Sequence, residues 1–128
     1  MRRSQLLALT GLFCTACSYP MAIELSQHAG HIVLGFHDCG TFFNSSVECE
    51  DVAIREYDPT TDTYGDWVCR AAFSPTRQWT YKETLPDCRP LIAGRTYEVT
   101  ASGTQGRDGS RIFKLTASGP LALDQACP

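Results

Sequence analysis

The chain has 128 residues, and 11 Lys and Arg against 14 Asp and Glu give a formal net charge of -3. This length is typical of one domain, and the mildly acidic balance provides no electrostatic attraction to nucleic acid or anionic lipid. Hydrophobic residues make up 43% and charged residues 20%, which excludes the composition of a disordered chain. Seven cysteines in so short a chain indicate an oxidising compartment.

The N-terminus has the features of a secretory signal peptide over residues 1–16. Met1-Arg2-Arg3 is a short basic start, and residues 6–13 form an uncharged, mostly apolar run. The apolar run is far shorter than the roughly 20 residues that a membrane-spanning helix needs. The sequence therefore predicts export of the chain and removal of this segment.

The residues before Cys17 resemble a bacterial lipobox, in which small residues precede a cysteine that receives lipid and becomes the first residue of the mature protein. Thr15 and Ala16 are the small residues, and Cys14 stands where the pattern usually has Leu. The resemblance implies lipidation of Cys17 and contact with a membrane through that anchor. The alternative is ordinary cleavage after Ala16 or after Ser18, with no lipid attached.

The cysteines after the signal are Cys39, Cys49, Cys69, Cys88 and Cys127. Nearness along the chain favours one disulfide between Cys39 and Cys49 and another between Cys69 and Cys88, which leaves Cys127 over. Each bridge would close a loop of roughly 10 to 20 residues and stabilise the fold by about 3 kcal/mol in the chain-entropy model. If Cys17 keeps its thiol, six cysteines remain and all of them could pair.

Short runs in which apolar and polar residues alternate recur along the mature chain, at residues 31–38, 52–57, 67–73, 79–82, 96–102 and 111–117. Alternation with a period of two and one polar face is the pattern of antiparallel strands that bury one face. In the third run, Trp67, Cys69 and Phe73 are expected to share the buried face. Asp108-Gly109 predicts a tight hairpin turn between the last two runs.

These runs predict an all-β fold, a small antiparallel β-sandwich stapled by disulfides. The expected organisation is a signal peptide over residues 1–16, an N-terminal linker over 17–30, the sandwich over 31–119 and a C-terminal tail over 120–128.

One stretch, Leu91-Ile92-Ala93-Gly94-Arg95-Thr96-Tyr97-Glu98-Val99, resembles the Leu-x-x-Gly-x-x-Tyr-x-Val motif of fibronectin type III domains. In that family the motif forms a tyrosine corner that leads into the sixth strand. The resemblance implies structural roles for Leu91, Gly94 and Tyr97, with Gly94 allowing the sharp turn and the buried Tyr97 bonding its hydroxyl back to the chain. It covers roughly residues 50–118 and concerns architecture, because a fold alone does not give a function.

The segment from Cys39 to Cys49 is the candidate binding site. The adjacent Phe42 and Phe43 can hardly both reach the core from an irregular loop. An aromatic side chain exposed on a constrained loop would be a suitable anchor for a partner protein. The alternative interpretation is that one Phe caps the end of the sandwich.

The sequence predicts neither enzymatic activity nor a bound metal or cofactor. Two of the histidines, His31 and His37, would lie about 20 Å apart on one strand, and the aspartates within residues 58–66 lack the spacing of a calcium loop. No nucleophile motif such as Gly-x-Ser-x-Gly occurs.

Together these patterns favour an exported, non-enzymatic protein that binds a partner or has a structural role in the cell envelope. It would be held at the membrane by lipid and face the periplasm or the cell surface, with a possible protein partner and no nucleic acid. The alternative is a soluble periplasmic or secreted inhibitor or immunity protein that blocks an enzyme with a loop.

Overall fold

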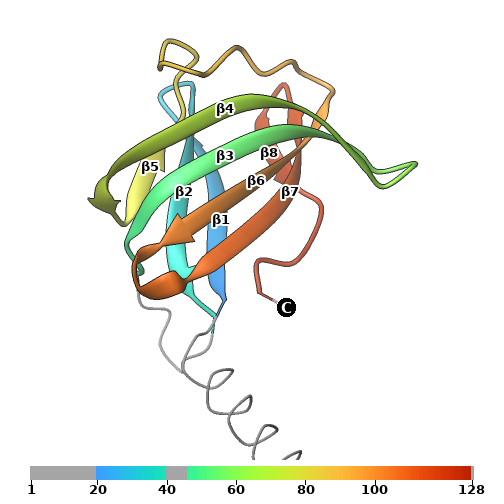
Figure 1. Ribbon diagram of the computed structural model, residues 1–128. Helices are drawn as coiled ribbons and strands as arrows, with labels where there is room; N and C mark the ends of the chain where they lie inside the picture. Colours follow the sequence, from blue (N-terminus) through green and yellow to red (C-terminus); the bar gives the residue numbers. More distant parts are fainter. Residues whose placement is uncertain (1–19, 40–45, 128) are drawn as a thin grey trace, which may run out of the picture.

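A computed structural model describes residues 20–39 and 46–127, and these residues form an all-β fold of two antiparallel sheets (Figure 1). The strands are β1 (Met21–His28), β2 (His31–Asp38), β3 (Cys49–Asp58), β4 (Thr63–Thr76), β5 (Gln78–Thr80), β6 (Thr96–Gly103), β7 (Asp108–Thr116) and β8 (Gly119–Ala122), with a 3-10 turn at Thr104–Gly106. The predicted all-β class is confirmed.

The strand order is β1-β2-β5 in the smaller sheet and β4-β3-β6-β7-β8 in the larger one. Alternate side chains from the two sheets meet in one core, as the period-two patterns predict. The core residues from the smaller sheet include Met21, Ile23, Ile32, Leu34 and Phe36, and those from the larger sheet include Val52, Ile54, Val68, Tyr97, Val99 and Phe113.

The predicted linker over residues 17–30 is wrong where β1 lies. Met21 and Ile23 are buried in the core, and β1 pairs with β2 from Met21 opposite Asp38 to His28 opposite His31. The strand has no clear alternation because polar residues occupy most of its second half, where Leu25 alone packs against the core. The predicted tail over 120–128 is wrong in part as well, because its first residues belong to β8, which pairs with β7.

The predicted pairing of Cys39 with Cys49 is wrong, whereas Cys69 pairs with Cys88 as predicted. Cys39 is bonded to Cys127, with 5.6 Å between the two Cα atoms. Cys49 is a free thiol, completely buried at the start of β3. Its side chain points into the core between the sheets, so closeness in sequence to Cys39 does not bring the two sulfur atoms together.

The bridge between Cys69 and Cys88 protects an edge of the larger sheet. β4 is an edge strand of the larger sheet, and an unpaired edge invites association with other strands. Arg70 donates its backbone N–H to the carbonyl of Asp87, and Arg89 donates to that of Val68. The disulfide therefore holds residues 87–89, the covering segment, against the middle of β4.

The turn before β6 has the geometry that the fibronectin-like motif predicts. Tyr97 is 1% exposed, and its hydroxyl accepts a hydrogen bond from the backbone N–H of Ile92 at 2.8 Å. Gly94 has a φ of +90°, a conformation that residues with a side chain rarely adopt. Leu91 is partly buried against the core. The motif thus fixes the entry of the chain into β6.

Asp108-Gly109 does not form the predicted hairpin turn. The chain turns at Thr104–Gly106, and both residues belong to β7. Gly109 instead allows a close approach between the two sheets, since a Cβ atom there would lie 2.2 Å from the carbonyl oxygen of Met21 on β1. A glycine within a strand often marks such an approach by another segment of backbone.

We expect Tyr97→Phe to lower the free energy of unfolding by about 1 kcal/mol or more, because the buried hydroxyl and its hydrogen bond from the Ile92 N–H are lost while the ring still packs. Tyr57→Phe is the matched control, since it removes an exposed hydroxyl and should change stability by about 0.5 kcal/mol or less. Urea denaturation measures both, and equal midpoints for the two variants would contradict the corner.

Gly109→Ala should destabilise the protein by about 1–3 kcal/mol, because backbone atoms of β1 must move to admit the methyl group. Gly35→Ala is the control from the same class of residue. A Cβ atom at Gly35 meets its nearest neighbour, His37 Nε2, at 3.5 Å, an ordinary contact. Thermal unfolding should therefore separate the two alanine variants. A Gly109→Ala protein as stable as Gly35→Ala would show that the sheets do not approach this closely.

Candidate functional site

Four side chains form a row on the outer face of the β3–β4 hairpin. The Arg55 guanidinium lies 3.6 Å from the centre of the Tyr64 ring and 5.1 Å from the centre of the Trp67 ring. The Arg70 guanidinium lies 4.4 Å from the Trp67 centre. Separations below about 6 Å are those of cation–π contacts. Tyr64, Arg55, Trp67 and Arg70 are called the cation–π row below.

Strand register brings the row together. Arg55 on β3 lies opposite Trp67 on β4, and Tyr57 lies opposite Tyr64. Directly opposed residues in antiparallel strands have Cβ atoms about 5 Å apart, so long side chains stack on one another. The Tyr57 and Tyr64 rings extend the row toward the tip of the hairpin, with centroids 5.2 Å apart.

A β-bulge turns Trp67 outward, which corrects the prediction that it shares the buried face with Cys69. Ile54 pairs with Cys69, but the next residue, Arg55, pairs with Trp67, so Val68 is an extra residue on β4. Val68 and Cys69 are both buried, while Trp67 is 40% exposed. One inserted residue reverses the faces of the residues that precede it, which is what bulges do in strands.

Glu98 on β6 holds Arg55 in place from the other side. The Nε and Nη2 atoms of Arg55 each lie 2.9 Å from Glu98 Oε1. Glu98 is only 7% exposed, and a carboxylate with so little access to water requires a charged or hydrogen-bonded partner. The positive charge of Arg55 is therefore balanced by the negative charge of Glu98 on the neighbouring strand.

Carboxylates near the row raise the pKa values of both tyrosines. The hydrogen bond that Tyr57 donates to Asp62, at 2.8 Å, raises the pKa of Tyr57 to about 12. The negative charge of Glu98 is the main cause that raises the pKa of Tyr64, and nearby Arg55 opposes it. Tyrosines at their ordinary pKa are already neutral at physiological pH, and these shifts extend the neutral state to more alkaline pH.

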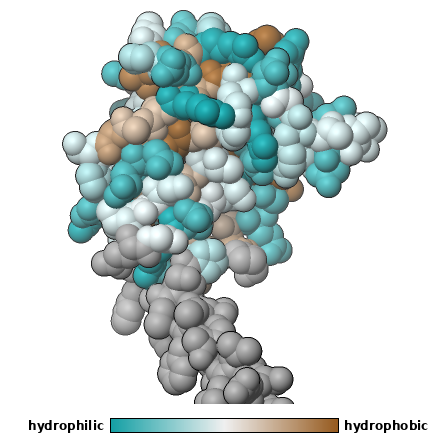
Figure 2. All heavy atoms as spheres, in the orientation of Figure 1, coloured by the Kyte–Doolittle hydropathy of each residue, from teal (hydrophilic) through white to brown (hydrophobic). Residues whose placement is uncertain are grey.

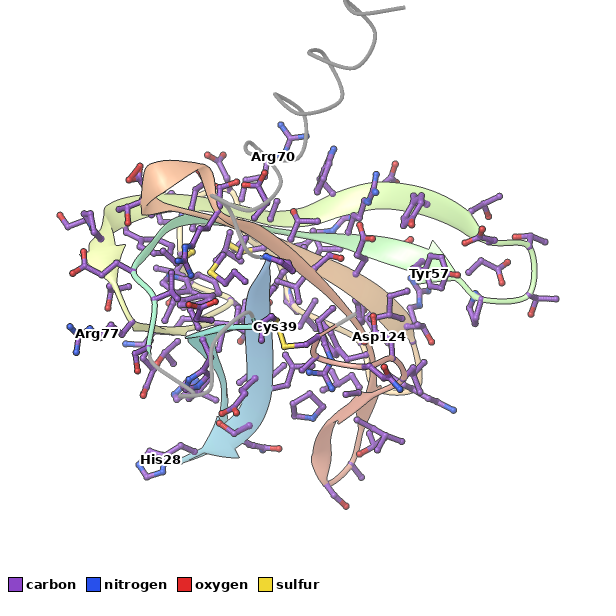
Figure 3. The ribbon with its side chains drawn as sticks, turned by 90° about the horizontal axis from the view of Figure 1, so that it is seen from below. His28, Cys39, Tyr57, Arg70, Arg77 and Asp124 are labelled. Atoms are coloured by element: carbon purple, nitrogen blue, oxygen red, sulfur yellow. A yellow bond between two sulfur atoms is a disulfide. The ribbon has the colours of Figure 1, made fainter. Side chains whose placement is uncertain are left out.

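The row is exposed on a part of the fold that projects. Tyr64 and Trp67 are 46% and 40% exposed, and Arg70 is exposed as well. The β3–β4 hairpin extends past the other strands in Figure 1, and the Arg70 side chain stands away from the ribbon in Figure 3. On the face drawn in Figure 2, hydrophobic residues lie in small groups among hydrophilic ones rather than in one broad area. Tyrosine, tryptophan and arginine are the residues that dominate binding hot spots.

Three predicted site residues, Cys17, Phe42 and Phe43, lie outside the described residues, so their lipidation and binding roles stay predictions. Of the cysteines, Cys69 and Cys88 are bonded as predicted, and Cys49 is buried with its pKa raised to about 11, chiefly by burial. A neutral thiol without access to solvent is chemically inert.

Within residues 20–39 and 46–127, no group of three or more His, Cys, Asp and Glu side chains is arranged to hold a metal ion. His37 Nε2 lies 3.1 Å from Glu24 Oε2 on the outer face of the smaller sheet. No helix in the described part of the chain is long and apolar enough to cross a membrane.

No family model matches this chain, and a comparison with curated proteins found no match. The site is therefore interpreted from its own residues.

The sequence contained a signal for the cation–π row that the strand patterns obscured. In the alternation of residues 52–57, Arg55 lies on the face opposite to Val52 and Ile54, and in the run 67–73 Arg70 lies opposite to the apolar residues. Placing Trp67 on the inner face separated it from both arginines. The pattern that marks the row is a pair of arginines, Arg55 and Arg70, on neighbouring strands with the aromatic Trp67 between them.

Glu98→Gln should lower the pKa of Tyr64, because the negative charge that opposes formation of the phenolate is removed. The pKa of Tyr57 should remain near 12 in that variant, since its main cause is Asp62. Asp62→Asn is the reciprocal control and should lower the pKa of Tyr57 more than that of Tyr64. Titration of the tyrosine rings by NMR measures both groups, and identical responses of the two rings to Glu98→Gln would contradict this assignment.

Proposed function

We propose that this protein is an exported, non-enzymatic binding module with a fibronectin type III-like sandwich, held at the cell envelope by lipid on Cys17. The observation that carries the binding role is the exposed cation–π row on the projecting β3–β4 hairpin. Its residues are fixed by stacking and by Glu98, so little side-chain entropy would be lost when a partner docks.

The strand order supports the fibronectin type III-like architecture. The first, second and fifth strands form one sheet, and the third, sixth and seventh lie together in the other. Immunoglobulin-like sandwiches divide these six strands in the same way, and here β4 and β8 complete the larger sheet. The tyrosine corner before β6 adds a local feature of the same kind.

The disulfides support export. Two bridges, one of them joining residues 88 apart in sequence, staple a small domain. Such bonds form and persist in oxidising compartments and are rare in the cytosol. The Cys39–Cys127 bond also fixes the end of the described residues beside the end of β2.

The cysteine arrangement favours a lipid anchor on Cys17. Four of the five cysteines that follow it are bonded to one another, and the fifth, Cys49, is 0% exposed in the core. Reaching Cys49 would require opening the sandwich. None of the described cysteines thus offers an accessible thiol to a cysteine at position 17, and a cysteine retained there in an exported protein would need another fate. Attachment of lipid is that fate. Each CH₂ group of the lipid that is buried in the membrane would contribute about 0.8 kcal/mol to membrane binding.

A lipid on Cys17 would orient the domain. Four peptide units separate Cys17 from Met21, a reach of at most about 14 Å. β1 begins beside the end of β2, where Cys39 donates its backbone N–H to the carbonyl of Pro20. This end of the sandwich would stay near the membrane, while the β3–β4 hairpin projects from another part of the fold (Figure 1).

Cys17→Ser should move the protein from the membrane fraction to the soluble fraction or stop its processing. The intact mass of the wild-type protein should carry the added lipid. An unmodified N-terminus at Cys17 or Tyr19 would contradict the anchor and favour the alternative of a soluble periplasmic or secreted inhibitor.

Counting thiols gives an independent readout. The folded wild-type protein should have no thiol that reacts at pH 8, because Cys49 is buried and its pKa is about 11. Denaturation without reductant should expose a single thiol. A second thiol would mean that Cys17 is retained without lipid.

A further inference from the structure

The cation–π row is poorly suited to stacking of a flat ligand. Two guanidinium groups already lie over the Trp67 ring, at 4.4 Å and 5.1 Å from its centre. The Tyr64 ring is covered in the same way by Arg55 at 3.6 Å. A sugar or a nucleobase would have to displace these cations before it could stack. The groups that remain accessible are the N–H groups of the exposed Arg70 guanidinium, at the Trp67 end of the row.

Arg70 differs from the other arginine of the row in its charge balance. Within the described part of the chain, Arg55 forms an ion pair with Glu98, whereas no carboxylate lies within ion-pair distance of Arg70. The contact with Trp67 places the Arg70 guanidinium over the ring, with its Cζ atom 4.4 Å from the ring centre. A guanidinium stacked through its face keeps its N–H groups in the plane of the group, where they match the two oxygens of a carboxylate.

The charge of the whole molecule restricts the class of ligand. The formal net charge is -3, so a long polyanion such as a nucleic acid would be repelled overall. A short acidic segment needs only the local positive end of the row. Aromatic side chains beside the arginine supply the apolar contact area that a protein segment can cover, as at other protein interfaces.

We propose that the cation–π row docks an acidic segment of a partner protein, with Arg70 binding a carboxylate through its N–H edge and Trp67 holding Arg70 in position. This inference names the partner class for the binding role proposed above and therefore rests on it.

The test uses the mature protein in detergent micelles and two short synthetic peptides, one rich in Asp and Glu and the other its Gln and Asn counterpart. Proton–nitrogen NMR spectra follow the indole N–H of Trp67, and the partly buried Trp79 provides an internal reference. The acidic peptide should shift the Trp67 signal and leave that of Trp79 in place. The effect should weaken as salt is raised from about 0.05 M to about 0.3 M, since the contact is exposed.

Variants locate the contact. Arg70→Gln should weaken binding of the acidic peptide by about tenfold, and Arg70→Lys should fall between it and the wild type because a lysine lacks the planar fork. Arg77→Gln is the matched control, since Arg77 is an exposed arginine outside the row without an ion pair to a described residue. Spectra that retain their dispersion establish that each variant is folded.

Several results would overturn the proposal. They are binding of neither peptide, equal binding of both, an equal loss in Arg70→Gln and Arg77→Gln, or preference for a phosphorylated peptide without carboxylates. Because the binding is measured in micelles, it does not depend on the anchor. Loss of peptide binding with normal lipidation would reject only the row, and a soluble unlipidated protein that binds the peptide would reject only the anchor.

Discussion

The alternation of side chains along β3 is the constraint on which both the core and the candidate site depend. Val52 and Ile54 face the smaller sheet and are buried, whereas Ala53 and Arg55 face outward. β3 lies between β4 and β6, so two neighbouring strands fix its register. A slip of one residue would exchange the two sets, burying Arg55 and exposing Ile54. The same packing that fixes the core therefore also places Arg55 beside Glu98.

The bulge at Val68 adds the second requirement. Without the extra residue, Trp67 would face the core and the two arginines would have no ring between them. The bulge lies next to Cys69, whose disulfide and neighbouring backbone hydrogen bonds hold the covering segment on this edge. Bulges are common at sheet edges and beside functional sites, where they redirect a side chain. Protection of the edge and exposure of the row thus arise from one short segment of β4.

The disulfides and the tyrosine corner tie the ends of the sandwich to the sheets. Cys39 and Cys127 join the end of β2 to the end of the described chain, and Tyr97 fixes the start of β6. Gly109 lets β1 approach β7 at a point where any side chain would interfere. The proposed lipid anchor precedes β1 by only a few residues, so the tether would act on a part of the fold that is already rigid.

The sequence by itself determined the features that depend on local chemistry. Period-two alternation indicated antiparallel strands, Gly94 and Tyr97 indicated the turn before β6, and a bridge between Cys69 and Cys88 followed from the cysteines themselves. Tertiary structure alone decided the pairing of Cys39 with Cys127, because their closeness comes from strands that fold back over most of the chain. It also decided that Trp67 faces outward, since a bulge exists only relative to the partner strand. The cation–π row joins residues from two strands, and its contacts arise only when register and bulge act together.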